Sequence, residues 1–340
     1  TFMLSTKEGR QVYVDPVIEG GSYRLTVKVG KPNGYESAKN GTKLARANFV
    51  CVISGTPIPS AYIMAECKAG RMGARLMAIV AEGERGRVYL SPTPEHEDVA
   101  QQAQPEWRPD VEFFQQALGF RVGNYGMTKW SDLFSLRQTV ALTTLCDLVE
   151  EAREEVKRDA LTNSHTDYSK SGAGDTNVAA YADSVGMYLA FAVDKLADRH
   201  SSLCTWDPTP TASGILHTFA RQALPMNWDY AEGNPFSEAS GNFDGNVGWI
   251  AKVIASSLPA VTAGSAVLGN AAIQSISSAK VVSTDPPYYD NVGYADLSDF
   301  FYIWLRRSLK SVYPELFTTV AVPKVDELVA TPGRHGSKEL

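Results

Sequence analysis

The chain has 340 residues, 44% of them hydrophobic, with 32 basic and 38 acidic side chains and a net charge of -6. This is enough for two or three domains with apolar cores, and it excludes a peptide, a fibre or a wholly disordered chain. No run reaches the ~18 apolar residues of a membrane span, and four cysteines without an export signal favour the cytoplasm, so we expect no membrane partner.

Residues 1–91 are expected to form a β-rich domain. Alternating apolar and polar residues predict a hairpin over residues 10–30, with Gly20 and Gly21 at its turn. Further expected elements are short strands at Phe49 to Ile53 and Arg87 to Leu90, and a helix near Pro59 to Lys68. The region holds 13 Lys and Arg against 7 Asp and Glu, which permits contact with a polyanion.

Residues 92–260 are expected to be a mainly helical insertion and a target-recognition region. Residues 92–109 read as a linker, after which Ser135 and Gln138 form a capping box. The helix that follows is predicted to reach Arg158, with Glu154 pairing with Arg158 on its outer face. Its apolar stripe is Leu142, Leu145, Val149, Ala152 and Val156.

The rest of this region alternates loops and helices. We expect loops at 162–176 and 207–214, a long helix marked by Tyr181, Val185, Leu189, Ala192 and Leu196, a shorter helix from Trp249 to Leu258, and a small-residue stretch to Ser278.

Residues 261–340 carry the most informative string. Lys280 to Thr284 fits a buried strand and leads into Asp285-Pro286-Pro287-Tyr288; a helix capped by Ser298 is predicted to follow. Open α/β sheets place their ligands at the carboxyl ends of strands, where this string would lie.

The string suits methylation of an exocyclic amine. The amine lone pair is delocalised into its ring, and acceptors on both N–H groups localise it toward an incoming methyl group. Asp285 can supply a carboxylate and Pro286 a carbonyl, while consecutive prolines fix φ and remove two donors. Tyr288 offers a face on which an extruded base can stack. The alternative is a proline-rich turn with ordinary exposed aromatics.

The segment VVSTDPPYYDNVGYADLSDFFYIWLRRSL (281–309) resembles adenine-specific DNA methylases of the large zinc-ribbon-containing type. Residues 65–97, 125–138 and 219–242 are similar to the same family, so the resemblance covers most of residues 45–340. It implies S-adenosylmethionine as cofactor, base flipping, an α/β fold with a partial Rossmann-like methyltransferase core, and catalytic roles for Asp285, Pro286, Pro287 and Tyr288, with Asp285 also next to the cofactor.

Two departures from the family pattern matter. The family's glycine-rich motif for the methyl donor has only a poor counterpart here, Asp15 to Gly21, because strand-like alternation and not a helix follows it. We therefore expect the donor site in a missing N-terminal part of a longer polypeptide. The chain also begins at Thr1 without Met, which favours a fragment. Where the family would place Cys-x-x-Cys, this chain has Cys51 and Ser54, so we expect no metal. His200 and Cys204 are expected to be unrelated to metal binding.

Other candidates have plain alternatives. The basic cluster Lys68, Arg71, Arg75, Arg85 and Arg87 is either a phosphate-binding surface or a solvated one. Arg306, Arg307 and Lys310 are better explained as complements to a helix dipole. Trp228 and Tyr230 line a nucleic-acid channel or, more commonly for aromatic residues, pack in a core.

The leading hypothesis is S-adenosylmethionine-dependent methylation of DNA, at adenine N6 because the resemblance points there. The alternatives are an RNA methyltransferase and a non-catalytic nucleic-acid-binding or assembly module of a restriction-modification or phage-defence system.

Overall fold

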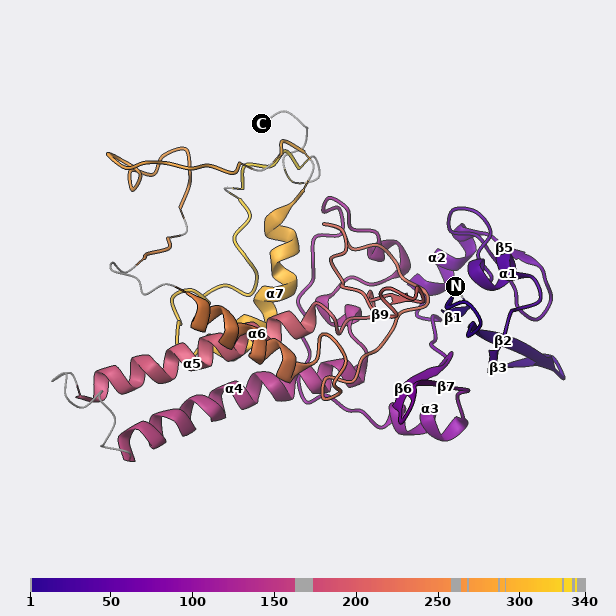
Figure 1. The fold of residues 1–340 in the computed structure, drawn as a ribbon. Coiled ribbons are helices and arrows are strands. Elements are labelled where there is room, and N and C mark those ends of the chain that lie inside the picture. Colours follow the sequence, from indigo (N-terminus) through magenta and orange to yellow (C-terminus); the bar gives the residue numbers. More distant parts are fainter. Residues whose placement is uncertain are drawn as a thin grey trace. The chain divides into compact units, whose positions relative to one another are not determined.

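The structure is a computed structural model that describes residues 2–162, 174–257, 264–267, 269–286, 288–290, 292–325, 327–331 and Arg334 (Figure 1). The chain forms two compact units. The first unit comprises Thr1–Glu112, Arg121–Thr144 and Ala197–Ser240, and the second comprises Phe113–Phe120, Leu145–Leu196 and Gly241–Leu340. The predicted domain boundaries at residues 91 and 260 stay a prediction.

The N-terminal sheet of the first unit is antiparallel, in the order β1 (Met3–Ser5), β2 (Val12–Glu19) and β3 (Ser22–Val29). Gly20 and Gly21 form the two-residue turn of the β2–β3 hairpin at φ 58° and 79°, values that glycine adopts at little steric cost. Met3, Val12 and Val14 are buried under the sheet. The predicted hairpin is confirmed.

The other strands of the first unit form two-stranded antiparallel sheets. These pair β4 (Phe49–Val50) with β5 (Pro57–Ile58), β6 (Ile79–Gly83) with β7 (Gly86–Leu90), and β8 (Trp206–Asp207) with β9 (Gly214–Ile215). Its shorter helices are α1 (Tyr35–Asn40), α2 (Ser60–Lys68), α3 (Pro94–Gln101) and the 3-10 helices η1 (Val122–Tyr125) and η2 (Trp130–Leu133). The strand expected at Phe49 to Ile53 is therefore only two residues long, and residues 92–109 are not wholly a linker because α3 lies within them.

Helix α4 (Leu136–Thr162) begins at the predicted capping box. The Gln138 side chain accepts a hydrogen bond from the Ser135 amide (2.9 Å), and the Ser135 hydroxyl accepts one from the Gln138 amide (3.1 Å). Leu142, Leu145 and Val149 are buried, as the stripe predicts. This helix start is thus encoded in a few neighbouring residues.

The ion pairs on α4 differ from the predicted one. Arg158 pairs with Glu155 at 2.7 Å instead of with Glu154. Arg153, which the sequence pattern did not single out, pairs with Asp183 of α5 (Gly174–Ala197) at 2.6 Å. In the second unit α4 and α5 lie side by side, and the Arg153 side chain packs against the backbone of Gly186 (Figure 1).

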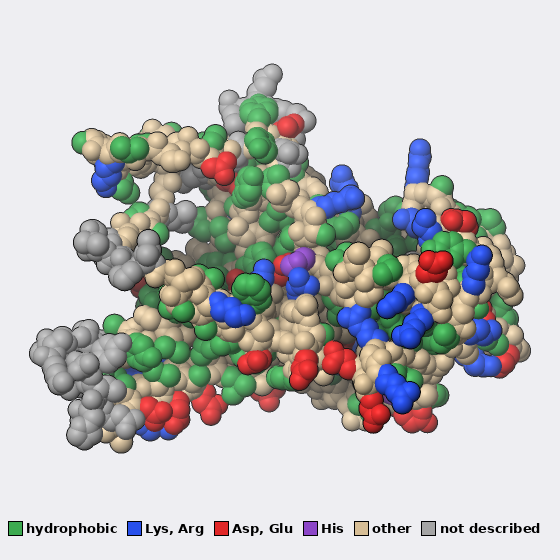
Figure 2. Space-filling model, in the orientation of Figure 1, with side chains coloured by type: hydrophobic (Ala, Val, Ile, Leu, Met, Phe, Trp, Pro, Cys, Tyr) green, Lys and Arg blue, Asp and Glu red, His purple; other side chains and the backbone are tan. Residues whose placement is uncertain are grey.

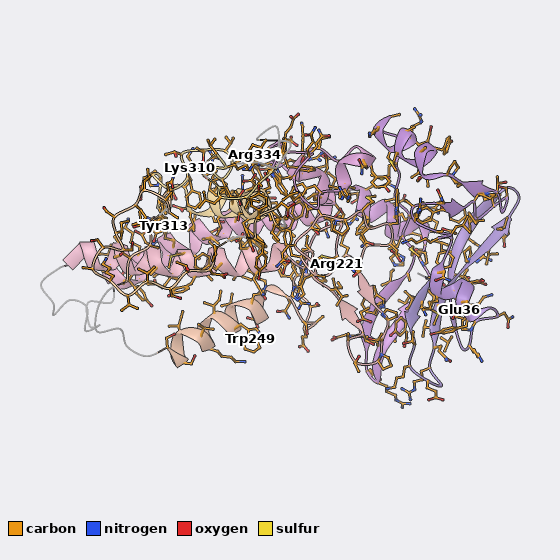
Figure 3. All side chains as sticks on the ribbon, turned by 90° about the horizontal axis from the view of Figure 1, so that it is seen from above. Glu36, Arg221, Trp249, Lys310, Tyr313 and Arg334 are labelled. Atoms are coloured by element: carbon orange, nitrogen blue, oxygen red, sulfur yellow. The ribbon has the colours of Figure 1, made fainter. Side chains whose placement is uncertain are left out.

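The two remaining helices of the second unit begin earlier than predicted. Helix α6 (Phe243–Ser256) is capped by Asn242, whose side chain accepts a hydrogen bond from the Gly245 amide. Its Trp249 side chain is 68% exposed (Figure 3). Helix α7 (Tyr294–Leu309) begins four residues before Ser298, whose hydroxyl donates to the Tyr294 carbonyl inside the helix and does not cap it.

Helix α7 supplies part of the core of the second unit, together with buried residues of α4 and α5. Phe300, Ile303 and Trp304 are almost fully buried, and burying each such side chain contributes about 1.5–3 kcal/mol. Asp296 and Asp299 share this buried face. Burial on that scale requires a cation beside each carboxylate.

Both carboxylates have one. Asp299 pairs with Lys324 at 2.8 Å and accepts the Val322 amide at 2.7 Å, while Asp296 pairs with Arg334 at 2.7 Å. These contacts hold the segment after α7 against the helix.

The predicted strand at Lys280 to Thr284 is wrong. These residues form no regular element, and Val281 and Val282 are 102% and 57% exposed. Every strand pair in the described part of the chain is antiparallel, and no parallel sheet is present there. The fold is therefore mixed α/β, with small antiparallel sheets and helices. None of the described helices is long and apolar enough to cross a membrane.

Replacing Lys324 with Met should destabilise the second unit by about 3–5 kcal/mol at pH 7, because Asp299 would remain buried without its cation. Burial raises the pKa of Asp299, and Lys324 opposes that rise. With Lys324 removed the folded-state pKa rises further, so the folded state holds the proton more tightly than the unfolded state does. Stability then falls as pH rises from the unfolded pKa, ~3.9, through the folded one.

The loss should consequently be largest at pH 7 and smaller at pH 5, as measured by urea unfolding followed by tryptophan fluorescence. Lys310→Met is the matched control, because Lys310 is exposed at the end of α7, the helix that carries Asp299 (Figure 3). A loss independent of pH would contradict this account of Asp299.

Candidate functional site

The Asp-Pro-Pro-Tyr turn lies in the second unit, in the irregular segment before α7. Asp285, Pro286 and Tyr288 are exposed, with 70% of Tyr288 accessible, and Pro287 lies outside the described residues. Within the described part of the chain, the Asp285 carboxylate has no hydrogen bond or ion pair. The Asp285 side chain is therefore open to a ligand.

The downstream end of this turn is fixed. The carbonyl of Tyr289 accepts the amide of Ala330 at 2.7 Å, and Ala330 is fully buried. At the start of α7, the Glu327 carboxylate accepts the Ala295 amide at 2.7 Å, which satisfies one of the amides left unpaired at a helix start. Arg334 lies 3.6 Å from Glu327. The turn thus precedes a helix whose first turn is tied to Glu327 and Arg334.

The basic cluster lies in the first unit, and all five of its side chains are exposed: Lys68, Arg71, Arg75, Arg85 and Arg87. Lys68 ends α2, and Arg85 lies in the turn between β6 and β7. Neither has an ion-pair partner among the described residues. In Figure 2 the basic side chains over the N-terminal elements are interspersed with acidic ones.

The other three members are held by groups within the chain. Arg71 makes two hydrogen bonds to Glu66, at 2.7 and 2.8 Å, and Arg75 pairs with Glu97 at 3.1 Å. Arg87 donates to a backbone carbonyl in the β8–β9 loop. A phosphate would have to compete with these contacts, so Lys68 and Arg85 are the members most available to a polyanion.

The nearest string to a donor motif does not form a phosphate loop. Residues 15–19 are paired within the β2–β3 hairpin, where Asp15 is opposite Thr26 and Glu19 is opposite Ser22. A strand, not a helix, follows the glycines. The string therefore lacks the helix N-terminus that makes a glycine loop an anion site.

The cysteines show no metal centre. The described residues contain no group of three or more His, Cys, Asp or Glu side chains placed to hold a metal. Cys204 is fully buried, with its sulfur 3.5 Å from the Thr218 hydroxyl, and His200 is also buried. A hydrogen bond from Ser54 lowers the pKa of the half-buried Cys51 thiol.

The remaining sequence candidates pack within the chain. Trp228 meets Tyr125 and Phe49 edge to face, with ring centroids 5.1 and 5.6 Å apart. At the end of α7, Arg307 pairs with Asp147 at 2.8 Å. Arg306 donates to a backbone carbonyl at 2.9 Å. These contacts favour the structural interpretation of each residue.

One feature was missed by sequence reasoning. A cavity of about 270 Å³ lies in the first unit, between the end of α2 and the segment that contains η1 and η2. Six of its lining residues lie between Tyr125 and Phe134, inside a block that the sequence singles out only by its similarity to methylases. Nothing in the sequence pointed to Arg108, which also lines the cavity.

No protein-family model, curated protein or solved structure matches this chain. The resemblance to DNA methylases therefore stays a prediction from the sequence.

Cys51 should be the thiol that reacts first with iodoacetamide in the folded protein. The Ser54 hydrogen bond lowers its pKa, whereas burial raises the pKa of Cys67 and raises that of Cys146 to about 12. Since the thiolate is the nucleophile, labelling at pH 7.5 followed by mass spectrometry should find Cys51 modified first.

Ser54→Ala should slow labelling of Cys51. Ser22→Ala is the control, because Ser22 is exposed at the start of β3 in the same unit. Equal labelling of Cys146 and Cys51 would contradict the assignment.

Proposed function

We propose that this chain contains the amine-binding half of a methyltransferase that acts on an exocyclic amino group of DNA, adenine N6 in particular. The observation that carries the proposal is the Asp285–Tyr288 turn, whose carboxylate and aromatic ring are exposed while the carbonyl of the next residue, Tyr289, is held by the Ala330 amide. An exposed carboxylate beside a proline-rich turn, followed by an exposed ring, matches what an extruded base requires.

In this proposal Asp285 and the carbonyl of Pro286 each accept one N–H of the target amine. Holding both protons draws the lone pair out of conjugation and directs it toward the methyl group. The proline at 286 has no amide proton, so the turn offers acceptors without a competing donor. The proton released on methylation would pass first to Asp285, the nearest base in the turn.

Tyr288 supplies the stacking surface. Stacking of a base on an aromatic side chain is typically worth ~1–3 kcal/mol and tolerates any base. Its exposed ring is therefore suited to holding the base, while the two acceptors select an amino group. Cytosine N4 offers the same group, and the preference for adenine rests on the sequence resemblance.

The methyl donor is S-adenosylmethionine in this proposal, but the residues that would hold it do not fit at Asp15 to Gly21, which form a hairpin. Asp285 is the one residue proposed here to lie next to the donor. We propose that an N-terminal part of the same polypeptide, upstream of Thr1, carries the donor loop. The exposed Val281 and Val282 support this, because β-branched residues form a strand readily once a neighbouring strand is supplied.

A second candidate is a non-catalytic nucleic-acid-binding module of a modification or phage-defence system in the cytoplasm. It is favoured by the same unformed strand and by the exposed Lys68 and Arg85. Calorimetry with S-adenosylmethionine separates the two: binding by the complete protein is required by the first proposal, and binding by the 340 residues alone would contradict the second. RNA as the substrate is decided by comparing methylation of matched DNA and RNA.

Asp285→Ala in the complete protein should lower methyl transfer to DNA at least about a hundredfold, the usual effect of removing one group that stabilises a developing charge. The measurement is incorporation of labelled methyl from S-adenosylmethionine. Lys280→Gln, five residues upstream and also exposed, should leave the rate unchanged. Near-normal activity of Asp285→Ala would overturn the assigned role.

Tyr288 gives a second, independent measurement. Tyr288→Phe keeps the ring and should retain most of the activity, whereas Tyr288→Ala should weaken productive DNA binding by about 5- to 150-fold, as loss of one stacked base predicts. Both values come from the DNA concentration dependence of the rate. Equal losses in the two variants would mean that the hydroxyl, not the ring, is what the reaction uses.

A further inference from the structure

Asparagine precedes glycine twice in this sequence, at Asn33-Gly34 and at Asn40-Gly41, and the two pairs lie at the two ends of α1. This dipeptide has a chemistry of its own. The amide nitrogen of the glycine can attack the side-chain carbonyl of the asparagine, because glycine has no Cβ to hinder the approach. Both asparagines are exposed, so exposure alone does not distinguish the two pairs.

The hydrogen bonds of the two glycine amides do distinguish them. Gly41 donates its amide to the Ser37 carbonyl at 2.8 Å, which closes the last turn of α1. Within the part of the chain that the structure describes, the Gly34 amide and the Asn33 side chain have no hydrogen-bond partner. The Gly34 nitrogen is therefore available to react, whereas the Gly41 nitrogen becomes available only when the end of the helix opens.

The space around Gly34 is also open. Gly34 is exposed at φ 80°, and a Cβ added there would meet only the Ser37 side chain, at an ordinary contact distance of 3.7 Å. Pro32, on the other side of Asn33, is buried. The segment is thus held before Asn33 and unobstructed after it, which leaves room for the Asn33 side chain to close a ring onto the Gly34 nitrogen.

We infer that Asn33 is a site of self-modification, at which the chain converts its own asparagine to aspartate and isoaspartate while the fold protects Asn40. The Gly34 nitrogen loses its proton to solvent and bonds to the side-chain carbonyl carbon of Asn33. The bond from that carbon to the side-chain nitrogen breaks, and ammonia leaves.

Water then opens the cyclic imide. Cleavage of its bond to the side-chain carbonyl gives aspartate, and cleavage of its bond to the main-chain carbonyl gives isoaspartate. The reaction consumes one water and needs no other reactant. It does not rest on the proposed methyl transfer, which uses residues of the second unit.

The modified residue lies close to the contacts that attach α1 to the N-terminal strand. The Gly34 carbonyl accepts the Ala38 amide at 3.2 Å, and the Ala38 carbonyl accepts the amide of Phe2, the residue before β1, at 2.8 Å. Aspartate adds only a charge at position 33, whereas isoaspartate adds a methylene group to the main chain directly before Gly34. The isoaspartate product should therefore loosen α1 from β1.

The test compares the two asparagines in the same sample. The chain is incubated in mildly alkaline buffer, either folded or unfolded in guanidinium chloride, and is then digested with trypsin. Cleavage after Lys39 places the two asparagines in different peptides, and mass spectrometry measures the conversion of each amide to an acid. The unfolded sample corrects for the different neighbours of the two pairs.

The ratio of the Asn33 rate to the Asn40 rate should be at least about twofold higher in the folded chain than in the unfolded one, which is the smallest effect expected from one backbone hydrogen bond. A smaller increase, or none, would overturn the inference. Asn33→Gln should abolish conversion in the peptide that ends at Lys39, because the longer glutamine side chain closes its ring far more slowly.

A variant tests whether the helix protects Asn40. Ala38→Gly should speed conversion of Asn40 about 2- to 5-fold and leave Asn33 unchanged, because glycine inside a helix makes its opening easier. Ala61→Gly is the matched control, since Ala61 is exposed in α2 of the same unit, and it should change neither rate. Melting temperatures verify that each variant folds. Equal acceleration of Asn33 and Asn40 by Ala38→Gly, or no acceleration of Asn40, would overturn the inference.

Discussion

The second unit depends on two carboxylates that are buried on the first turns of α7. Asp296 and Asp299 are each only 2% exposed, a position that a charge occupies only with a partner. The segment after the helix supplies both partners, Lys324 and Arg334. These ion pairs therefore hold Lys324 and Arg334 against the helix, and Ala330, which lies between them in the sequence, donates its amide to the carbonyl of Tyr289. The residue that follows the candidate turn is thus held by a segment whose two cations lie 36 and 46 residues after Tyr288.

Local signals predicted local structure well. The hairpin at residues 10–30 and the capping box at Ser135 and Gln138 each depend on residues that are close in the sequence, so their patterns are legible without the rest of the chain. The predicted start of α7 is wrong because that start depends on a residue far away in the sequence. The amide of Ala295, the second residue of the helix, is satisfied by Glu327, 32 residues away, and no sequence pattern near Ser298 indicates that contact.

The unformed strand at Lys280 to Thr284 marks the limit of such reasoning. A run of β-branched residues indicates that a strand would be favourable, but a strand also needs a neighbour to accept its hydrogen bonds. The cavity in the first unit was out of reach for another reason. It brings together Met72, Arg108 and Phe134 from three separate stretches, and only folding places them around one space. The Asp285 turn could be chosen from sequence because its four residues are contiguous.

The Asp285 turn and the cavity in the first unit differ in how their polar groups are organised. At the Asp285 turn, the acceptors come from one short segment that is fixed on its downstream side. At the cavity, the charged side chains of Arg108 and Asp132 come from separate stretches and share one lining with the buried rings of Tyr125 and Phe134. An exposed turn requires that the ligand itself, or another segment, exclude water from the acceptors.

In the first unit, Gly126 lies so close to α2 that a Cβ there would be 3.0 Å from the Cys67 carbonyl. The spacing there is set by main-chain atoms of α2 and of Gly126, the residue after η1, while the charge of the adjoining cavity comes from the side chains of Arg108 and Asp132. Shape and chemistry are thereby encoded at different positions. Substitution of Arg108 or Asp132 therefore changes the charge of the cavity and leaves its dimensions in place, whereas any side chain at position 126 would push α2 away.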